Sequence, residues 1–268
     1  MAITSSVEEV LPDLVRVRYL IANAYLQGTP DNWVLVDAGL PGSTGTIVDA
    51  AEDRFGADNP PEAIILTHGH FDHRGALQDL LERWPVSVYA HVNEIPHLTG
   101  RAGYPPPDPT VGGGVMSLLS FAFPASSIDL GDRVRALPDD FSVPGMPGWR
   151  WIHTPGHTDG HVSLVRDGDG TLIAGDAFVT THEESAYDVV RDKAEVHRPP
   201  AYFTPDWVSA RQSVEALAAL RPITAVTGHG PAMSGAPLQD GLEALAANFG
   251  DAMPDQGRYV RDTDSTAT

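Results

Sequence analysis

An apolar run that stops in a histidine-rich loop constrains this chain more than any other feature. Residues 62–66 (EAIIL) are typical of a buried β-strand, and residues 67–75 (THGHFDHRG) follow at once. Three imidazoles and one carboxylate therefore lie within six residues, where a strand ends and a loop begins. An exposed loop rarely gathers ligand-type side chains at this spacing without a purpose. The loop predicts part of a metal site, with four candidate ligands: His68, His70, Asp72 and His73.

Three further ligand-type residues stand at expected strand ends, each beside a glycine. His157 follows one strand, Asp176 follows a hairpin that turns at residues 167–170 (DGDG), and His229 follows the strand expected at 223–226. In an α/β sheet, residues at strand ends collect along one edge. Five imidazoles and two carboxylates suit Zn²⁺, Fe²⁺ or Mn²⁺. Seven ligands exceed the needs of one four-coordinate ion, so we expect two divalent metal ions that share a bridging group, with zinc favoured.

Charge and composition exclude several classes of function. The chain has 36 acidic and 17 basic residues, for a net charge of −19. Such a surface repels phosphate backbones and anionic lipid, so we expect no nucleic-acid partner and no membrane partner. The absence of cysteine excludes disulfides, thiolate metal sites and cysteine nucleophiles. The first residues lack a basic and apolar signal pattern, which favours a cytoplasmic enzyme with a small-molecule substrate.

Strands and helices alternate along the chain in a rhythm typical of an α/β layered domain. We expect one domain over residues 1–250, in halves of about 1–132 and 133–250, and a polar tail over 251–268 that frays from Arg258. Strands are expected at 14–26 (two strands with a break near 22–23), 32–37, 63–66, 86–90, 149–153, 162–165, 171–174 and 223–226, and helices at 43–55, 75–84, 205–220 and 237–249.

Residues 91–131 are expected to be irregular because proline and glycine clusters interrupt them. They contain an apolar segment, residues 115–123, which either lines a substrate pocket or a dimer contact or packs on the core as a short helix. A homodimer is left open. Together with residues 177–204, this segment is where we expect substrate specificity to reside.

The full ligand pattern resembles the metallo-β-lactamase superfamily. The resemblance rests on His68-x-His70-x-Asp72-His73 followed by His157, Asp176 and His229, and on the flanking segments 36–39 (VDAG) and 154–158 (TPGHT). It extends over about residues 14–250. It implies a four-layer αβ/βα sandwich of two similar halves, with the metal ions at one edge of the paired sheets.

The resemblance also implies a role for each ligand. His68, His70 and His157 would hold the first ion, Asp72, His73 and His229 the second, and Asp176 would bridge both. Asp37 and Thr67 would orient ligand imidazoles from behind, and His161 would be a hydrogen-bonded support residue. The nucleophile would be a metal-bridging hydroxide, because two adjacent divalent ions lower the pKa of a shared water. Asp72 stands where it could shuttle a proton.

Other candidate residues rest on weaker signals. Tyr187 and Tyr202 follow Asp176, in a region from which a tyrosine touches the substrate carbonyl in lactonase-like relatives. His182 and His197 fall in the same stretch and are candidates for lining the pocket. His91 and His153 are expected on strands with structural roles, and His97 in an irregular segment.

The ligand set resembles those of glyoxalase II and the N-acyl homoserine lactonases. This similarity implies a dinuclear hydrolase of carboxylic esters, lactones or thioesters. Only Arg258 and Arg261 are basic beyond residue 238, which weakens a glutathione thioester as substrate. Three alternatives remain: a mononuclear iron oxidoreductase similar to the persulfide dioxygenases, a side activity on β-lactams or phosphotriesters, and a protein that binds metal without catalysis.

Overall fold

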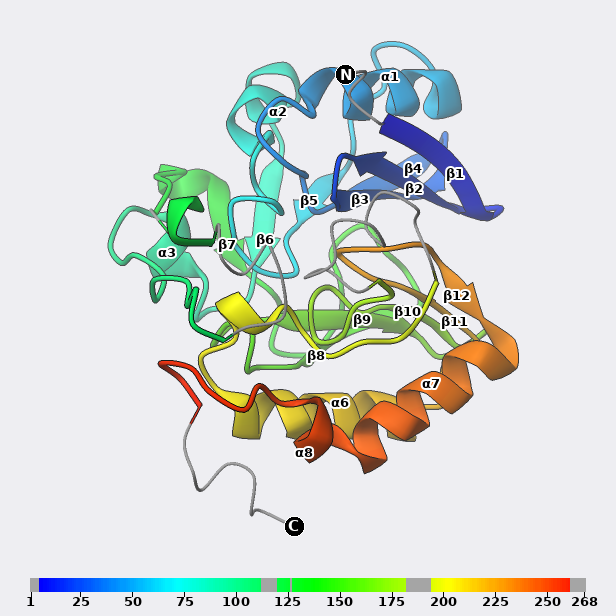
Figure 1. The fold of residues 1–268 in the computed structure, drawn as a ribbon. Helices are drawn as coiled ribbons and strands as arrows, with labels where there is room; N and C mark the ends of the chain where they lie inside the picture. Colours follow the sequence, from blue (N-terminus) through cyan, green and yellow to red (C-terminus); the bar gives the residue numbers. More distant parts are fainter. Residues whose placement is uncertain (1–4, 112–119, 126, 182–193, 261–268) are drawn as a thin grey trace. The chain divides into compact units, whose positions relative to one another are not determined.

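The protein is described by a computed structural model for residues 5–111, 120–125, 127–181 and 194–260. It divides into two compact units: unit 1 contains residues 1–104 and 126–150, and unit 2 contains residues 105–125 and 151–268. The chain has two β-sheets with helices packed on them (Figure 1), which confirms the mixed α/β class expected from the sequence.

Unit 1 is built on a seven-stranded sheet whose strands lie in sequence order. The strands are β1 (Ser5–Leu11), β2 (Leu14–Tyr19), β3 (Ala22–Thr29), β4 (Asn32–Val36), β5 (Ala63–Ile65), β6 (Ser87–Ala90) and β7 (Val134–Ala136). Strands β1 to β4 pair antiparallel, and β4 to β7 pair parallel. Strand β1 was not expected from the sequence, and the break between β2 and β3 falls at Leu20 and Ile21 rather than near 22–23.

Helices α1 (Thr44–Phe55) and α2 (Leu77–Arg83) connect the parallel strands and pack on the core of unit 1. Trp33 lies at the centre of this core: it stacks on Phe55 with ring centroids 4.7 Å apart and meets Trp84 edge-on at 5.4 Å. Such aromatic contacts stabilise a core beyond the apolar area they bury. This packing holds the loops that leave β4 and β5. Asp37 follows β4, and the four candidate ligands of unit 1 follow β5.

Unit 2 is built on a five-stranded sheet in the order β12-β11-β10-β9-β8. Its strands are β8 (Trp149–His153), β9 (Val162–Arg166), β10 (Thr171–Ile173), β11 (Thr224–Val226) and β12 (Met233–Ser234). Helices α6 (Trp207–Ala219) and α7 (Gly235–Ala247) lie on the same side of this sheet (Figure 1), and α8 (Phe249–Ala252) follows α7. Helix α6 is preceded by the N-cap residue Asp206, whose carboxylate accepts from Ser209 N, so a side-chain cap and not only the preceding proline starts the helix.

The segment expected to be irregular contains short helical turns. These are α3 (Ile95–Leu98), η1 (Ser120–Ala122) and η2 (Gly131–Arg133), and η3 (Ala201–Phe203) lies further along the chain. His97 belongs to α3, and His91 follows β6 directly, so the expected places of both residues were wrong. His153 is the last residue of β8, as expected.

Of the apolar segment 115–123, residues 115–119 lie outside the described residues, and Phe121 is exposed. Within the described ranges, no helix is long and apolar enough to cross a membrane.

The start of the C-terminal tail is anchored, contrary to the expectation that it frays from Arg258. Arg258 N donates to the buried Asp108 carboxylate, and Tyr259 Oη donates to Pro106 O at 2.7 Å. Asp108 Oδ1 also accepts from Thr110 N at 2.9 Å and from Thr110 Oγ1 at 2.6 Å. Burial raises the pKa of Asp108, but the hydrogen bonds from Thr110 and Arg258 outweigh it, so the pKa lies below its ordinary value.

The Asp108→Asn variant is expected to lose about 1–3 kcal/mol of unfolding free energy at pH 7, because the amide nitrogen must face either Thr110 N or Arg258 N, and both are donors. A carboxyl with a depressed folded-state pKa stabilises above its unfolded pKa, about 3.9, and this contribution is lost as the pH falls through the lower folded value. The difference between variant and wild type should therefore narrow from about pH 4 downward. Urea unfolding at several pH values measures it, with the exposed Asp255→Asn as control. A difference in unfolding free energy that stays constant down to pH 2 would contradict this role of the carboxylate.

Candidate metal centre

In unit 1, a single buried carboxylate organises the histidine-rich loop. Asp37 follows β4 with a φ of 59°, a left-handed conformation that Asp tolerates better than most residues. Its Oδ1 accepts from Thr67 N at 2.8 Å, and its Oδ2 accepts from Thr67 Oγ1 at 2.8 Å and from His73 Nδ1 at 2.9 Å. Asp37 and His73 are almost fully buried. The end of β4 is thereby tied to the loop that follows β5.

These hydrogen bonds decide which imidazole nitrogens are available to a metal ion. His73 Nδ1 carries the proton because it donates to the Asp37 carboxylate, so Nε2 presents a lone pair. Thr67 uses its own proton on Asp37, so its oxygen accepts from His68 Nδ1 at 3.1 Å. His68 Nε2 then also presents a lone pair. Asp37 thus sets the tautomer of His73 directly and that of His68 through Thr67.

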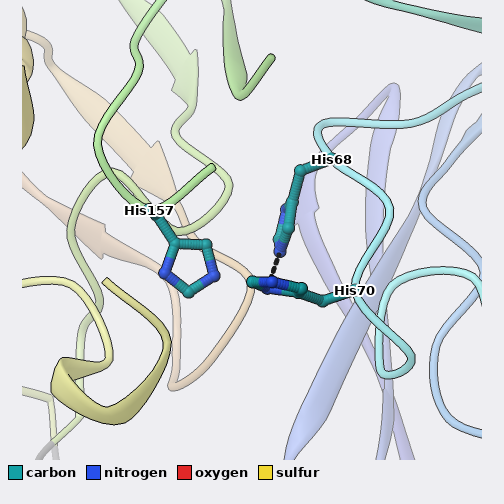
Figure 2. Close-up of side chains that lie close together, drawn as sticks. All are labelled: His68, His70 and His157. Atoms are coloured by element: carbon teal, nitrogen blue, oxygen red, sulfur yellow. Dashed lines mark hydrogen bonds between the residues drawn. The ribbon is translucent and has the colours of Figure 1, made fainter. Parts of the chain in front are cut away.

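The next ligand candidate, His70, lies against His68 within the same loop. His68 Nε2 and His70 Nδ1 are 3.1 Å apart, and Figure 2 shows the two rings nearly perpendicular. Two nitrogen ligands of a tetrahedral ion at about 2.0–2.1 Å would be about 3.3–3.4 Å apart. The observed spacing is close to that value. Asp72 is buried in the same loop, whose turn is closed by the bond from His73 N to His70 O at 3.0 Å.

In unit 2, the three remaining candidates lie together around the carboxylate of Asp176. Asp176 Oδ2 is 3.2 Å from His229 Nε2 and 3.4 Å from His157 Nε2. All three side chains are buried. His157 Nδ1 lies 3.4 Å from Thr204 Oγ1, which donates its own proton to Pro200 O at 2.8 Å and so serves as acceptor for the imidazole. This contact favours a lone pair on His157 Nε2, the nitrogen that faces Asp176.

His161 supports this cluster through hydrogen bonds. Its Nε2 accepts from Asp176 N at 2.8 Å, so the ring proton lies on Nδ1, which donates to Thr154 Oγ1 at 2.8 Å. Thr154 continues the chain to Ser163 Oγ at 3.0 Å. Both ring nitrogens of His161 are thus engaged with the protein. The backbone at Asp176 is fixed by this relay from β9 and the loop before it.

The loop that carries His157 is held against α6 at a position that only glycine allows. Gly156 has a φ of 129°, and a Cβ there would lie 2.3 Å from Ala210 N. The loop that carries His229 is held by Thr180, whose Oγ1 donates to Pro231 O at 2.6 Å and whose N donates to His229 O at 3.1 Å. Thr180 and Thr204 carried no sequence signal, because each acts through a contact with a residue that is remote in sequence.

The weaker candidates differ in how the structure places them. Tyr202 is buried in η3, where its ring lies 5.2 Å from that of Phe203 and its backbone O accepts from Asp108 N. His197 is half-buried and bridges Val179 through the backbone. His182 and Tyr187 lie outside the described residues. These two contacts of Tyr202 lie within its own unit. A role for Tyr202 in substrate binding stays a prediction.

A second buried group in unit 1, Arg74, Glu94 and Tyr104, was missed by sequence reasoning. Tyr104 Oη donates to the Glu94 carboxylate, and Arg74 Nε donates to Gly69 O at 2.6 Å. Burial and then the charge of Glu94 raise the pKa of Tyr104 well above its ordinary value, which keeps the phenol protonated. Burial lowers the pKa of Arg74, while Tyr104 and Asp72 act to raise it. Glu94 and Tyr104 lie in the proline- and glycine-rich stretch, where no periodic pattern marks them.

A family model described as the metallo-beta-lactamase superfamily matches residues 17–229 of the chain. The chain belongs to this superfamily. Its similarity to the probable metallo-hydrolase YflN of Bacillus subtilis (strain 168) is 49% identity over 229 residues, which covers 84% of this chain and 87% of that protein. This metallo-β-lactamase-fold chain is also 35% identical over 119 residues to the hydroxyacylglutathione hydrolase of Xylella fastidiosa (strain M23), which covers 44% of this chain and 33% of that protein.

Among solved structures, the crystal structure of TTHA1623 in a di-iron-bound form matches with a TM-score of 0.54 and 25% identity. The match covers 86% of this chain and 96% of that chain. The superfamily and the fold expected from the sequence are thereby confirmed. The assignment of each ligand to one ion or the other stays a prediction.

Proposed function

We propose that this protein is a dinuclear metal-dependent hydrolase that acts on carboxylic esters, lactones or thioesters of small molecules. The observation that carries the proposal is that, within each unit, candidate ligand atoms lie at the spacing that a shared metal ion requires. In unit 1, His68 Nε2 and His70 Nδ1 lie 3.1 Å apart, and in unit 2, His229 Nε2 and Asp176 Oδ2 lie 3.2 Å apart. Supporting hydrogen bonds leave the lone pairs of His68 and His73 on Nε2. Histidines that only fill a core would have no need for such closely spaced ligand atoms in both units.

The proposed ligand groups are those that the family pattern in the sequence implies. His68, His70 and His157 would hold one ion, and Asp72, His73 and His229 would hold a second. Asp176 would be shared by both ions. The donor set contains nitrogen and carboxylate oxygen without sulfur, which suits zinc, iron or manganese. Figure 2 draws the three imidazoles assigned to the first ion.

When bound, the two ions would supply a water of lowered pKa and polarise the carbonyl of the substrate. The residues of the chain would hold the ligands in position for that chemistry. Asp37 keeps His68 and His73 in the ligating tautomer, and the relay through His161 fixes the backbone of Asp176. Asp72 is buried within the ligand loop, where its carboxylate can hold a proton during turnover.

The names of the relatives support a hydrolase and leave the substrate class to be tested. YflN is a probable metallo-hydrolase and resembles this chain over most of its length, whereas the hydroxyacylglutathione hydrolase resembles less than half of it. Only the shorter match bears on thioesters, so we propose the broader ester, lactone and thioester class. The di-iron form of TTHA1623 makes iron a metal to be tested beside zinc.

The test is metal removal combined with a substrate screen. The purified protein is assayed on p-nitrophenyl esters, homoserine lactones, S-lactoylglutathione, phosphotriesters and a cephalosporin, with metal content measured in parallel. We expect about two ions per chain, loss of at least about 100-fold in activity after chelation, and recovery when Zn²⁺ is restored. Hydrolysis that survives complete metal removal would refute the proposal. A single iron per chain together with consumption of O₂ would instead favour the mononuclear iron oxidoreductase similar to the persulfide dioxygenases.

A further inference from the structure

Both backbone polar groups of Gly69 are held by buried charged side chains. Gly69 N donates to Glu94 Oε2 at 3.0 Å, and Gly69 O accepts from Arg74 Nε at 2.6 Å. Glu94 is 0% exposed and Arg74 is 8% exposed. Burying charged groups is costly unless hydrogen bonds satisfy them. Two such groups on one glycine therefore indicate that the position of this peptide matters.

Tyr104 joins the same group and extends it to His70. Its hydroxyl donates to the Glu94 oxygen that also receives Gly69 N. The Tyr104 ring meets the His70 ring edge-on, with centroids 4.7 Å apart, and stacks on the His97 ring, with centroids 4.1 Å apart. The Tyr104 ring is thus confined by two imidazoles and one hydrogen bond. We call Glu94, Arg74 and Tyr104 the Gly69 clamp.

Tyr104 and Leu98 occupy the space that a side chain at residue 69 would need. A Cβ on Gly69 would lie 2.2 Å from Tyr104 Oη and 3.0 Å from Leu98 Cδ2. Any larger residue would push Tyr104 away from Glu94 and His70. The glycine and the clamp are therefore complementary in shape as well as in hydrogen bonding.

The residues on either side of Gly69 are His68 and His70, whose facing nitrogens are 3.1 Å apart. A change in the φ or ψ of Gly69 would rotate one imidazole relative to the other. We propose that Glu94 is a positioning residue that, through the Gly69 clamp, sets the separation of His68 and His70 and hence the affinity for the ion they hold. This inference rests on the proposed metal function. A merely structural Glu94 would change the stability of the protein without favouring one ion over the other.

The experiment compares stepwise metal affinities in the full-length wild type, Glu94→Ala, Glu94→Gln and a control, Glu82→Ala, which removes an exposed carboxylate on α2. Metal-free protein is titrated with Co²⁺ against a competing chelator, and visible absorption reports the ligand field. Loss of a residue that supports metal ligands typically weakens metal affinity about 10–100-fold. We expect that loss for one ion in Glu94→Ala, a smaller change for the other ion, and none for Glu82→Ala. Glu94→Gln should restore most of the affinity, because its amide oxygen can accept from both Gly69 N and Tyr104 Oη.

A second readout needs no metal. In metal-free Glu94→Ala, the peptide that contains Gly69 should exchange its amide hydrogens faster than in wild type, and Glu94→Gln should return it toward the wild-type rate. If Glu94→Ala does not fold, Tyr104→Phe decides, because it keeps the ring beside His70 and removes only the hydroxyl that donates to Glu94. It should weaken the same ion as Glu94→Ala, by a smaller factor, and leave the other ion unchanged. Equal weakening of both ions, or no weakening in any folded variant, would overturn the inference. A wild type that binds no ion would instead refute the proposed function.

Discussion

Replacing Asp176 with asparagine is expected to lower kcat/KM by about 10³-fold, the magnitude typical of losing a central electrostatic group in an active site. Asp176 Oδ2 faces His229 Nε2 at 3.2 Å and His157 Nε2 at 3.4 Å. Asparagine has nearly the same shape, so packing around the side chain should persist. It lacks the negative charge, and its amide nitrogen has no lone pair for a metal. The loss should therefore appear in metal content and turnover, while the metal-free variant should unfold at the same temperature as the metal-free wild type.

The matched control for this change is Asp240→Asn, which makes the same substitution at an exposed position on α7. It should leave kcat/KM and metal content unchanged. The measurement is steady-state hydrolysis of the best substrate from the screen, with metal analysis of the same samples. If Asp176→Asn kept more than about half of the activity, Asp176 could not be the shared ligand.

The second large effect is expected at Asp37, where the Asp37→Asn variant should reduce metal affinity by about 10–100-fold. The amide must point its nitrogen either toward Thr67 N or toward His73 Nδ1, and both positions already hold donors. In the second orientation His73 would move its proton to Nε2, the nitrogen that is meant to bind the ion. Because Asp37 is almost fully buried, the opposed donors should also cost about 1–3 kcal/mol of stability.

Asp58→Asn is a close control because Asp58 also has a positive φ, 57°, and is exposed. It makes the same chemical change at the same type of backbone conformation. Metal titration, together with ¹⁵N NMR of the imidazole nitrogens in the metal-free protein, would separate the two effects. An unchanged His73 tautomer combined with unchanged metal affinity would show that Asp37 does not act through the imidazole.

The strand and helix pattern could be anticipated because it depends on local chemistry. Apolar runs such as 63–65 and the helical spacing of Leu77, Leu80 and Leu81 produce β5 and α2 at the expected places. Strand β1 was missed because its side chains are mostly exposed, so its sequence lacks an apolar face. It forms because its backbone pairs with β2, which is information that a local pattern does not contain.

The candidate site was only partly predictable for a similar reason. Ligand residues such as His68 and Asp176 are recognisable because their side-chain chemistry and spacing are unusual in any chain. Glu94 was not recognisable, because a glutamate in an irregular segment is ordinary until its carboxylate is found buried on Gly69 N. The anchoring of the tail on Asp108 escaped notice because the partners are 150 residues apart.

The sequence by itself determined the family, the set of candidate ligands and their places at strand ends, since these follow from residue type, spacing and short-range periodicity. Only the tertiary structure decided which nitrogen of His68 and His73 is left for a metal ion. That choice depends on Asp37, whose bonds to Thr67 and His73 span 30 and 36 residues. The tertiary structure also decided how firmly Gly69 is held. Tautomers and peptide orientations are set by hydrogen bonds between segments, and such bonds exist only once the strands that carry them have been brought side by side.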